Sequence, residues 1–325
     1  MGKKKILLLF VASLQGWGHD ISPLERPPFE QTILTKAAEK RIFSVDDAQR
    51  VRDIEAFMVS KPKGKVNLIS EMSPAKNQGQ RGTCSSFATM GLVEHFIDRN
   101  ADYSEQCLAY FSASDDGGNI GDKLSFILSQ GIYREGDCPY KDPKDFDNWL
   151  LANDKEQENL ALEARNTIPL LTNIRKLTPA FRVIRKHVDE LSDGEYLRYI
   201  QNQLDDGIPV GAAMVSIGEE WTKRGMIEKI PGPEQIKKEC KDRQKSSALS
   251  FSAMPFKKCD SHAVVLTGYD DAKKLIYFKN SWDENWGLDE NMNVTSASGE
   301  RRGYGAFSYA YLTKFRVNSL ITLSR

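Results

Sequence analysis

The chain has 325 residues, 40% hydrophobic and 28% charged, which is ordinary for a soluble globular protein with room for about two domains. Lysine plus arginine and aspartate plus glutamate each total 45, so the formal net charge is zero. This balance gives no reason to expect nucleic acid or an anionic membrane as a partner. The chain also has no run of 18 or more apolar residues, the length that a membrane-spanning helix needs.

The first residues have the order of charge and hydropathy that a secretory signal peptide needs. Lys3 to Lys5 are positive, residues 6–14 are nearly all apolar, and Gly16 and Gly18 are small enough for a cleavage site. The apolar part is too short for a membrane helix; the alternative is a short buried strand. We expect residues 1–18 to be removed and the protein to be secreted or exported to a periplasmic, extracellular or lysosome-like compartment.

Residues 19–60 are rich in charge and contain three prolines. Within them, the apolar spacing from Thr35 to Phe57, including Ile42 and Ile54, predicts one or two short amphipathic helices. The segment is too small to hold a core alone. We expect a propeptide, with an amino-terminal extension of the next lobe as the alternative, and residues 61–64 resemble a linker.

Two helices are predicted in the next part of the chain. Residues 84–99 lack proline and carry apolar side chains on more than half of their circumference, which indicates a mostly buried helix that starts close to Cys84. Residues 120–130 indicate a second helix, ended by Gly131. A plausible capping box at residues 192–195 begins a third helix that runs to about Asp206.

In the carboxyl-terminal third, the spacing of apolar residues changes from a helical pattern to one typical of strands. Residues 208–215, 262–269, 275–279 and 304–309 are short runs rich in Val, Ile, Tyr and Phe, and the turn at 270–274 predicts a hairpin between the middle two. Helices first and strands later is the order of an α+β protein with two lobes. Two polar stretches are treated as insertions, residues 141–190 and 232–256.

One segment places an amide and a thiol close together. Gln78 lies six positions before Cys84, and glycines at 79 and 82 allow the intervening backbone to turn tightly. A cysteine at the amino end of a helix experiences the positive end of the helix dipole, which favours the thiolate. The Cys84 N–H and the Gln78 side chain are therefore candidate donors to an oxyanion.

Two later segments supply a base and its partner. His262 opens a predicted strand, which would hold the imidazole rigidly. Asn280 follows the paired strand, and a neutral amide there can accept the second imidazole N–H and orient the ring. Trp282, two residues later, can keep water away from that hydrogen bond.

These segments resemble the papain-like cysteine peptidases, and the order Gln78, Cys84, His262, Asn280 is that family's order. The resemblance implies a two-lobed fold, a helical lobe at about 66–190 and a β lobe at about 191–325, with the active site between them. It covers roughly residues 66–315. Further matching segments are Tyr103–Gln106, Asp116–Gly118, Gly131–Tyr133, Pro139–Tyr140, Trp221–Ile227, Trp286–Gly287 and Gly303–Tyr304.

The chain departs from the family signature beside the nucleophile. The signature reads Cys-Gly-[Ser/Ala]-Cys-[Trp/Tyr], whereas this chain has Arg81 in place of the first cysteine and Ser85 in place of the aromatic residue. The disulfide that would brace the active-site loop therefore cannot form. Ser261 stands where an aspartate usually precedes the histidine. His262 and Asn280 also lie farther beyond Cys84 than the family's roughly 130–150 residues, as the insertions require.

The resemblance implies a peptidase, made as a zymogen, whose partners are polypeptide substrates and its own propeptide. Cys84 attacks the peptide carbonyl, His262 transfers protons, Asn280 orients His262 and Gln78 completes the oxyanion hole. Gly117 and Gly118 are expected to pair with the substrate backbone. No metal or organic cofactor is implied.

The sequence also has three other interpretations. An amidase or acyl-transferase would use the same Cys-His-Asn chemistry. A non-catalytic binding protein on this fold would be expected to have lost one of the four residues, and none is lost. A structural zinc site lacks the close Cys and His spacing that such sites use.

The five cysteines suit an exported protein with one reactive thiol. With Cys84 set aside, the other four permit three pairings. We favour Cys107 with Cys138 and Cys240 with Cys259, because each pair closes a local loop.

Overall fold

The structure, a computed structural model, describes most of the chain after residue 34. Its described residues belong to one compact unit, and no helix among them is long and apolar enough to cross a membrane. The expected signal peptide, residues 19–34 of the expected propeptide, and the expected pair Cys240–Cys259 lie outside the described residues. The described ranges are 35–60, 63–112, 116–145, 148, 151–169, 177–217, 221, 225–238, 261–289, 291–293 and 302–325.

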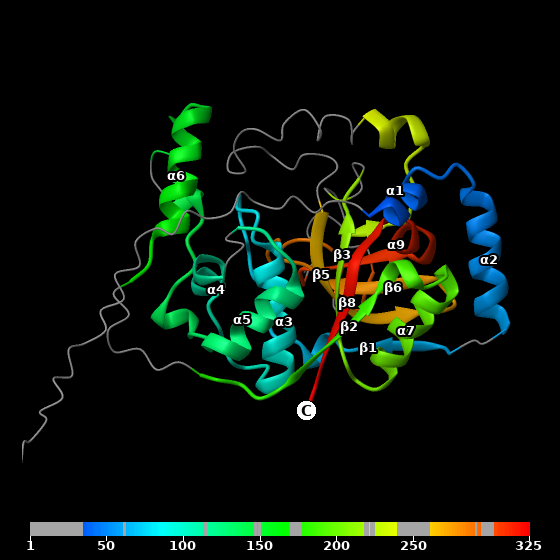
Figure 1. The fold of residues 1–325 in the computed structure, drawn as a ribbon, viewed down its shortest axis with the longest axis horizontal. Coiled ribbons are helices and arrows are strands. Elements are labelled where there is room, and N and C mark those ends of the chain that lie inside the picture. The colour runs from blue at the N-terminus through cyan, green and yellow to red at the C-terminus, as the bar shows by residue number, and fades with distance from the viewer. Residues whose placement is uncertain are drawn as a thin grey trace, which may run out of the picture. The chain divides into compact units, whose positions relative to one another are not determined.

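The first lobe is helical, and its first three helices follow one another along the chain (Figure 1). Most of the middle of the first helix is buried, as its nearly continuous apolar surface predicted. The next two begin at side-chain caps, since Ser104 accepts from Cys107 N and Asn119 from Asp122 N. The helices are α3 (Cys84–Ile97), α4 (Glu105–Phe111) and α5 (Ile120–Gln130), which confirms the two predicted here.

The second lobe is built on a sheet whose strand order is β2-β8-β3-β5-β6-β7-β4, with β1 also pairing with β5. Neighbouring strands are antiparallel except β4 and β7, which are parallel. The predicted strands in the carboxyl-terminal third are confirmed within two residues. The bounds are β1 (Lys65–Asn67), β2 (Arg182–His187), β3 (Val210–Val215), β4 (Met226–Ile227), β5 (Ser261–Asp270), β6 (Leu275–Lys279), β7 (Tyr304–Ser308) and β8 (Arg316–Ser324).

The two faces of the sheet carry different cores. Along β5, Val264 and Leu266 point into one apolar cluster, whereas Ala263 and Val265 point into the other. This alternation follows from the two-residue period of a strand. The first cluster is covered by α7 (Asp193–Asp205), which has the predicted capping box, and by α9 (Tyr309–Phe315). The second lies against α3 and α5, so β5 is buried on both sides.

The hairpin between β5 and β6 has the predicted turn. Val265 pairs with Lys279 and Asp270 with Leu275, so β6 runs back beside β5. The chain therefore leaves β6 at Asn280, close to the start of β5, where His262 lies. A local hairpin thus joins two residues of the candidate site.

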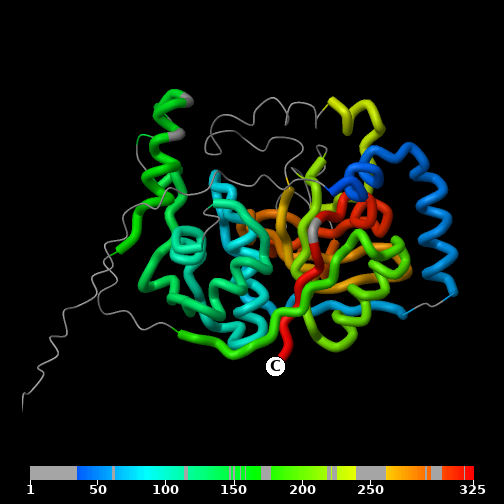
Figure 2. Tube along the Cα trace, in the orientation of Figure 1, coloured from blue at the N-terminus to red at the C-terminus, as the bar shows by residue number. Residues whose placement is uncertain are grey.

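The expected helices near the amino terminus are present as α1 (Lys36–Ile42) and α2 (Asp47–Ser60). Figure 2 shows this blue segment along the β lobe, beside α7 and α9 and away from α4. Ile42 and Ile54 are buried in the same apolar cluster as the helices of the β lobe. Among the described residues, α1 and α2 pack on that lobe rather than over Cys84. The inhibitory role expected for residues 19–60 stays a prediction.

In the described part of the stretch 141–190, the helix α6 (Asp154–Asn166) and the strand β2 were not predicted, nor were the short 3-10 helices Pro143–Asp145 and Val188–Glu190. Strand β2 pairs with β8 along six residues and so already belongs to the sheet, ahead of the expected lobe boundary at residue 191. Only Val183 and Ile184 of its six residues are apolar and the others are arginine, lysine or histidine, which hides it as a strand in the sequence.

Candidate active site

Cys84 is the first residue of α3, as predicted. It lies outside the described disulfide and its side chain is partly exposed. The ten residues that follow are buried, so the helix holds the thiol in a fixed position. The thiol therefore combines access to solvent with the positive end of a 14-residue helix dipole.

His262 and Asn280 form a buried hydrogen bond, with 2.7 Å between imidazole Nε2 and amide Oδ1. An amide oxygen only accepts, so Nε2 carries the proton and Nδ1 is the basic nitrogen of the neutral ring. Burial lowers the pKa of His262 to about 4, against the opposing effect of the Asn280 hydrogen bond. A thiolate near the ring would likewise favour the charged form.

Two tryptophans enclose the imidazole. Trp282 lies 4.9 Å from the His262 ring, tilted by 34°, and Trp221 meets it edge-on at 5.3 Å. Trp221 is itself fixed, because its indole N–H donates to Tyr311 Oη at 2.7 Å. Trp282 therefore lies against the imidazole together with a second indole, and its shielding role stays a prediction.

Packing of α3 along β5 brings the thiol and the imidazole to the same end of the lobe interface. Ala88 lines one pocket with Ala263, and Val265 Cγ2 lies 3.4 Å from the position that a β-carbon on Gly91 would take. The helix and the strand therefore run in the same direction. Counting back from this contact, the seven helical residues from Gly91 to Cys84 and the three strand residues from Val265 to His262 each span about 10 Å. Cys84 and His262 lie at those two ends.

The Gln78 side chain is buried and held from both sides. Its Nε2 donates to Arg81 O at 2.7 Å, its Oε1 accepts from Ser281 Oγ, and its backbone N–H donates to Ser281 O at 2.9 Å. A primary amide has two N–H donors, so a second one is left for a ligand. Because Ser281 follows Asn280, the same loop orients both predicted amides.

The chain was compared with known proteins on the basis of sequence and of structure. It is 35% identical to cysteine proteinase 3 of Entamoeba histolytica over 97 residues, which cover 27% of this chain and 31% of that protein. It is 25% identical to mexicain of Jacaratia mexicana over 241 residues, which cover 71% of this chain and 87% of mexicain. No family model matches the chain.

Among solved structures, the fold matches xylellain, a cysteine protease from Xylella fastidiosa. The TM-score is 0.50 with 16% sequence identity, over 82% of this chain and 87% of xylellain. This likeness confirms the predicted two-lobed α+β fold. In sequence the chain is similar to cysteine proteinases, and its fold is papain-like.

In this papain-like fold, the loop expected to bind substrate backbone follows Asp116. Gly118 has φ 76°, a left-handed conformation in which a side chain would be strained, so glycine is required there. The carbonyl of Gly117 accepts from Ser85 Oγ at 2.6 Å, one residue beyond Cys84. Gly117 is thus connected directly to the first turn of α3, and Gly118 follows it in the chain.

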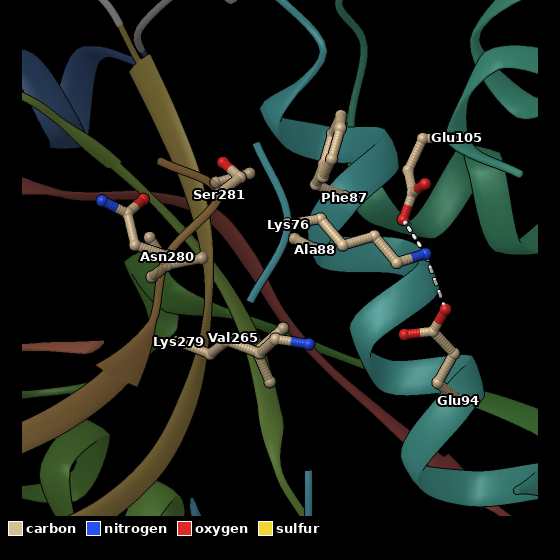
Figure 3. Close-up of a pocket in the computed structure, with 11 residues that line it drawn as sticks. Lys76, Phe87, Ala88, Glu94, Glu105, Val265, Lys279, Asn280 and Ser281 are labelled. Atoms are coloured by element: carbon tan, nitrogen blue, oxygen red, sulfur yellow. Dashed lines mark hydrogen bonds and ion pairs between the residues drawn. The ribbon is translucent and has the colours of Figure 1, made fainter. Parts of the chain in front are cut away.

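Beside Asn280 and Ser281 lies a largely buried cluster of charges (Figure 3). Lys76 Nζ lies 3.0 Å from Glu94 and 2.9 Å from Glu105, and burial, which lowers its pKa, is outweighed by these carboxylates, which raise it. Lys279, next to Asn280, donates to Ser73 Oγ at 2.7 Å, and burial lowers its pKa to about 8. The cluster joins α3, α4 and the end of β6 next to the candidate site.

Sequence reasoning assigned no role to three residues that support the site. Trp221 was seen only as part of a matching segment, Ser281 only as a neighbour of Asn280, and Tyr140 only as part of a landmark pair. Adjacency to a predicted site residue was the available signal for Ser281.

The disulfide between Cys107 and Cys138 is present, with Cα atoms 6.0 Å apart, and confirms that predicted pairing.

Proposed function

We propose that this chain is a cysteine peptidase that hydrolyses peptide bonds through a thioester intermediate. The observation that carries the proposal is the buried 2.7 Å hydrogen bond between His262 and Asn280. It leaves Nδ1 as the basic nitrogen at the end of the lobe interface where α3 presents Cys84. A thiol, an oriented base and an amide donor from Gln78 are the groups that acyl transfer from an amide requires.

In the first half of the reaction, the Cys84 thiolate forms a bond to the peptide carbonyl carbon. The oxyanion accepts from the Cys84 N–H and from the remaining Gln78 N–H. The imidazolium of His262 gives its proton to the leaving amine, and the C–N bond breaks. The acyl group then remains on sulfur as a thioester.

In the second half, His262 takes a proton from water, whose oxygen attacks the thioester carbonyl. The C–S bond breaks, the carboxylic acid leaves and the thiolate returns. Asn280 keeps the ring oriented through both halves, and the two tryptophans keep water from competing for that hydrogen bond.

The test is to identify the products formed from an unfolded protein by mass spectrometry, with Cys84→Ala as the control. Internal cuts made by the wild type and not by Cys84→Ala are expected. Release of ammonia from side-chain amides, or transfer of acyl groups to an added amine without internal cuts, would show an amidase or acyl-transferase. Tight peptide binding without turnover would show a non-catalytic binding protein.

The cellular setting follows from the same proposal. We infer that polypeptides are the substrates, that the enzyme is exported with residues 1–18 removed, and that it is made as a zymogen. The disulfide Cys107–Cys138 supports export, because such bonds form and persist mainly in oxidising compartments. The apolar contacts of α1 and α2 favour an amino-terminal segment that is anchored on the β lobe through residues 35–60.

A further inference from the structure

Arg81, Thr83 and Ser85 are the positions beside Cys84 at which this chain departs from the family signature, and the first and last of them share a structural target. Both side chains reach the same short loop, residues 116–118. This loop carries Gly117 and Gly118, which are expected to pair with the substrate backbone. The two departures therefore act on one contact between the nucleophile and the substrate loop.

Arg81 makes a forked ion pair with Asp116. Nε lies 2.8 Å from Oδ2 and Nη2 lies 2.6 Å from Oδ1, with the Arg81 side chain 1% exposed. Its Nη1 donates to Gln106 Oε1 and, at 3.0 Å, to Lys141 O. Paired N–H···O bonds of this kind fix orientation as well as distance, which a single charge contact does not.

Ser85 and Tyr140 extend the same connection. Ser85 Oγ donates to Gly117 O at 2.6 Å, inside the first turn of α3. Tyr140 Oη donates to Gln78 O at 2.8 Å and lies 2.6 Å from Thr83 Oγ1, while its ring lies 4.9 Å from the Arg81 guanidinium carbon. Residues 78–85 are therefore joined to the loop at 116–118 by the Arg81–Asp116 pair and the Ser85–Gly117 bond, both partly buried, while Tyr140 holds the loop before Cys84.

We propose that Arg81, through Asp116, and Ser85, through Gly117, are positioning residues that set the distance between the Cys84 sulfur and the backbone of an extended peptide substrate. This inference rests on the proposed peptidase function. Neither side chain touches the reacting atoms, so their removal shifts where a long substrate lies and leaves the reactivity of the thiol itself in place. Short substrates that do not reach residues 117 and 118 are insensitive to the change.

The test compares a long peptide with a single-residue ester, with rates expressed per active thiol. Arg81→Gln combined with Asp116→Asn removes both charges of the ion pair together, since removing Asp116 alone would leave the buried Arg81 unpaired. We expect KM for the long peptide to rise about 10-fold or more, because displacements near 1 Å have effects up to about 100-fold. The rate of ester hydrolysis and the rate of Cys84 alkylation by iodoacetamide should each change less than about twofold.

Ser85→Ala keeps the inference testable if the double variant does not fold, since it removes one neutral hydroxyl and should raise the same KM. Arg81→Lys keeps the charge but not the fork and should recover only part of the loss. The matched control is Arg185→Gln with Asp122→Asn, an exposed ion pair between β2 and α5, which should change nothing.

Two outcomes would overturn the inference. A KM for the long peptide that stays unchanged in both the double variant and Ser85→Ala shows that the contacts do not position substrate. If the rates of long-peptide hydrolysis, ester hydrolysis and Cys84 alkylation all fall by the same factor, the Arg81 and Ser85 contacts only maintain the fold. If the wild type alkylates at Cys84 but hydrolyses neither substrate, the proposed function itself fails, and the positioning role fails with it.

Discussion

The side chains of His262 and Asn280 are 18 positions apart in the sequence and meet at 2.7 Å in the folded chain. Their hydrogen bond is buried, so losing one partner leaves a polar group without water to replace it. Asn280 in turn is held through its backbone N–H, which donates to Gly303 O at 2.9 Å. At the scale of single residues, the site is therefore fixed by buried hydrogen bonds whose partners water cannot easily replace.

Removing the nucleophile or the base should abolish nearly all turnover, because the two act as a unit. Cys84→Ala and His262→Ala are expected to leave only background hydrolysis of a fluorogenic peptide. Gln78→Ala should lower kcat by about 10²–10³, the usual effect of losing one oxyanion donor. Asn280→Ala should be milder, because this residue orients the base without moving a proton. Full activity in Cys84→Ala would rule out the mechanism.

A second prediction concerns stability at low pH. Burial lowers the pKa of His262 to about 4, whereas an unfolded histidine titrates near 6.5. Its neutral form therefore contributes stability above about pH 6.5, and this contribution is lost as the pH falls toward about 4. At ~1.4 kcal/mol per pKa unit, the loss is up to about 3 kcal/mol.

This loss is best measured as Tm against pH in Cys84→Ala, which removes both self-digestion and the thiolate that would oppose the effect. Adding His262→Gln should flatten the curve between pH 6.5 and 4. Adding His187→Gln, an exposed histidine that lies opposite Ser319 in the β2–β8 pair, should leave the slope as it was. An unchanged slope in the His262→Gln variant would assign the acid sensitivity to other groups.

At the scale of elements, α1 and α2 are packed as parts of the β lobe. Ala38 and Ile42 of α1 and Ile54 and Met58 of α2 belong to the apolar cluster beneath α7 and α9. Polar contacts add to this, since Lys314 Nζ lies 2.7 Å from Asp47 and Arg50 lies 3.4 Å from Asp193. A propeptide that leaves after cleavage would expose this apolar surface.

A chain that starts at residue 61 is therefore expected to unfold at a lower temperature than one that starts at residue 35. Ile42→Ala and Ile54→Ala in the longer chain should each cost about 2–5 kcal/mol, as for other buried isoleucines. Val59→Ala, at an exposed position of α2, is the matched control and should cost little. If the shorter chain is equally stable and more active on a fluorogenic peptide, the segment is a removable inhibitor.

At the scale of the whole molecule, the cysteines report on the compartment. One disulfide is described, between Cys107 and Cys138, and Cys84 is not part of it. If the protein is exported, thiol titration of the denatured, unreduced protein should give one reactive thiol of the five cysteines. The mature chain should lack residues 1–18 by amino-terminal sequencing. Five titratable thiols would contradict both the bridges and export.

The sequence alone indicated α3, α5, α7 and the hairpin of β5 and β6, because local patterns specify each of them. An apolar circumference, a glycine stop, a capping box and a turn between two β-branched runs all act over a few neighbouring residues. The four catalytic candidates were also recognisable, since short segments around Gln78, Cys84, His262 and Asn280 keep their chemistry and their order.

Tertiary structure decided what depends on residues distant in the chain. Strand β8 lies between β2 and β3 and is largely buried, so it lacks the alternation that marks a half-exposed strand. The contact of Trp221 with the His262 ring and the pairing of Arg81 with Asp116 join loops that no local pattern relates. The destination of α1 and α2 was likewise open, because an amphipathic helix has an apolar face in its sequence but its partner is chosen only by the fold.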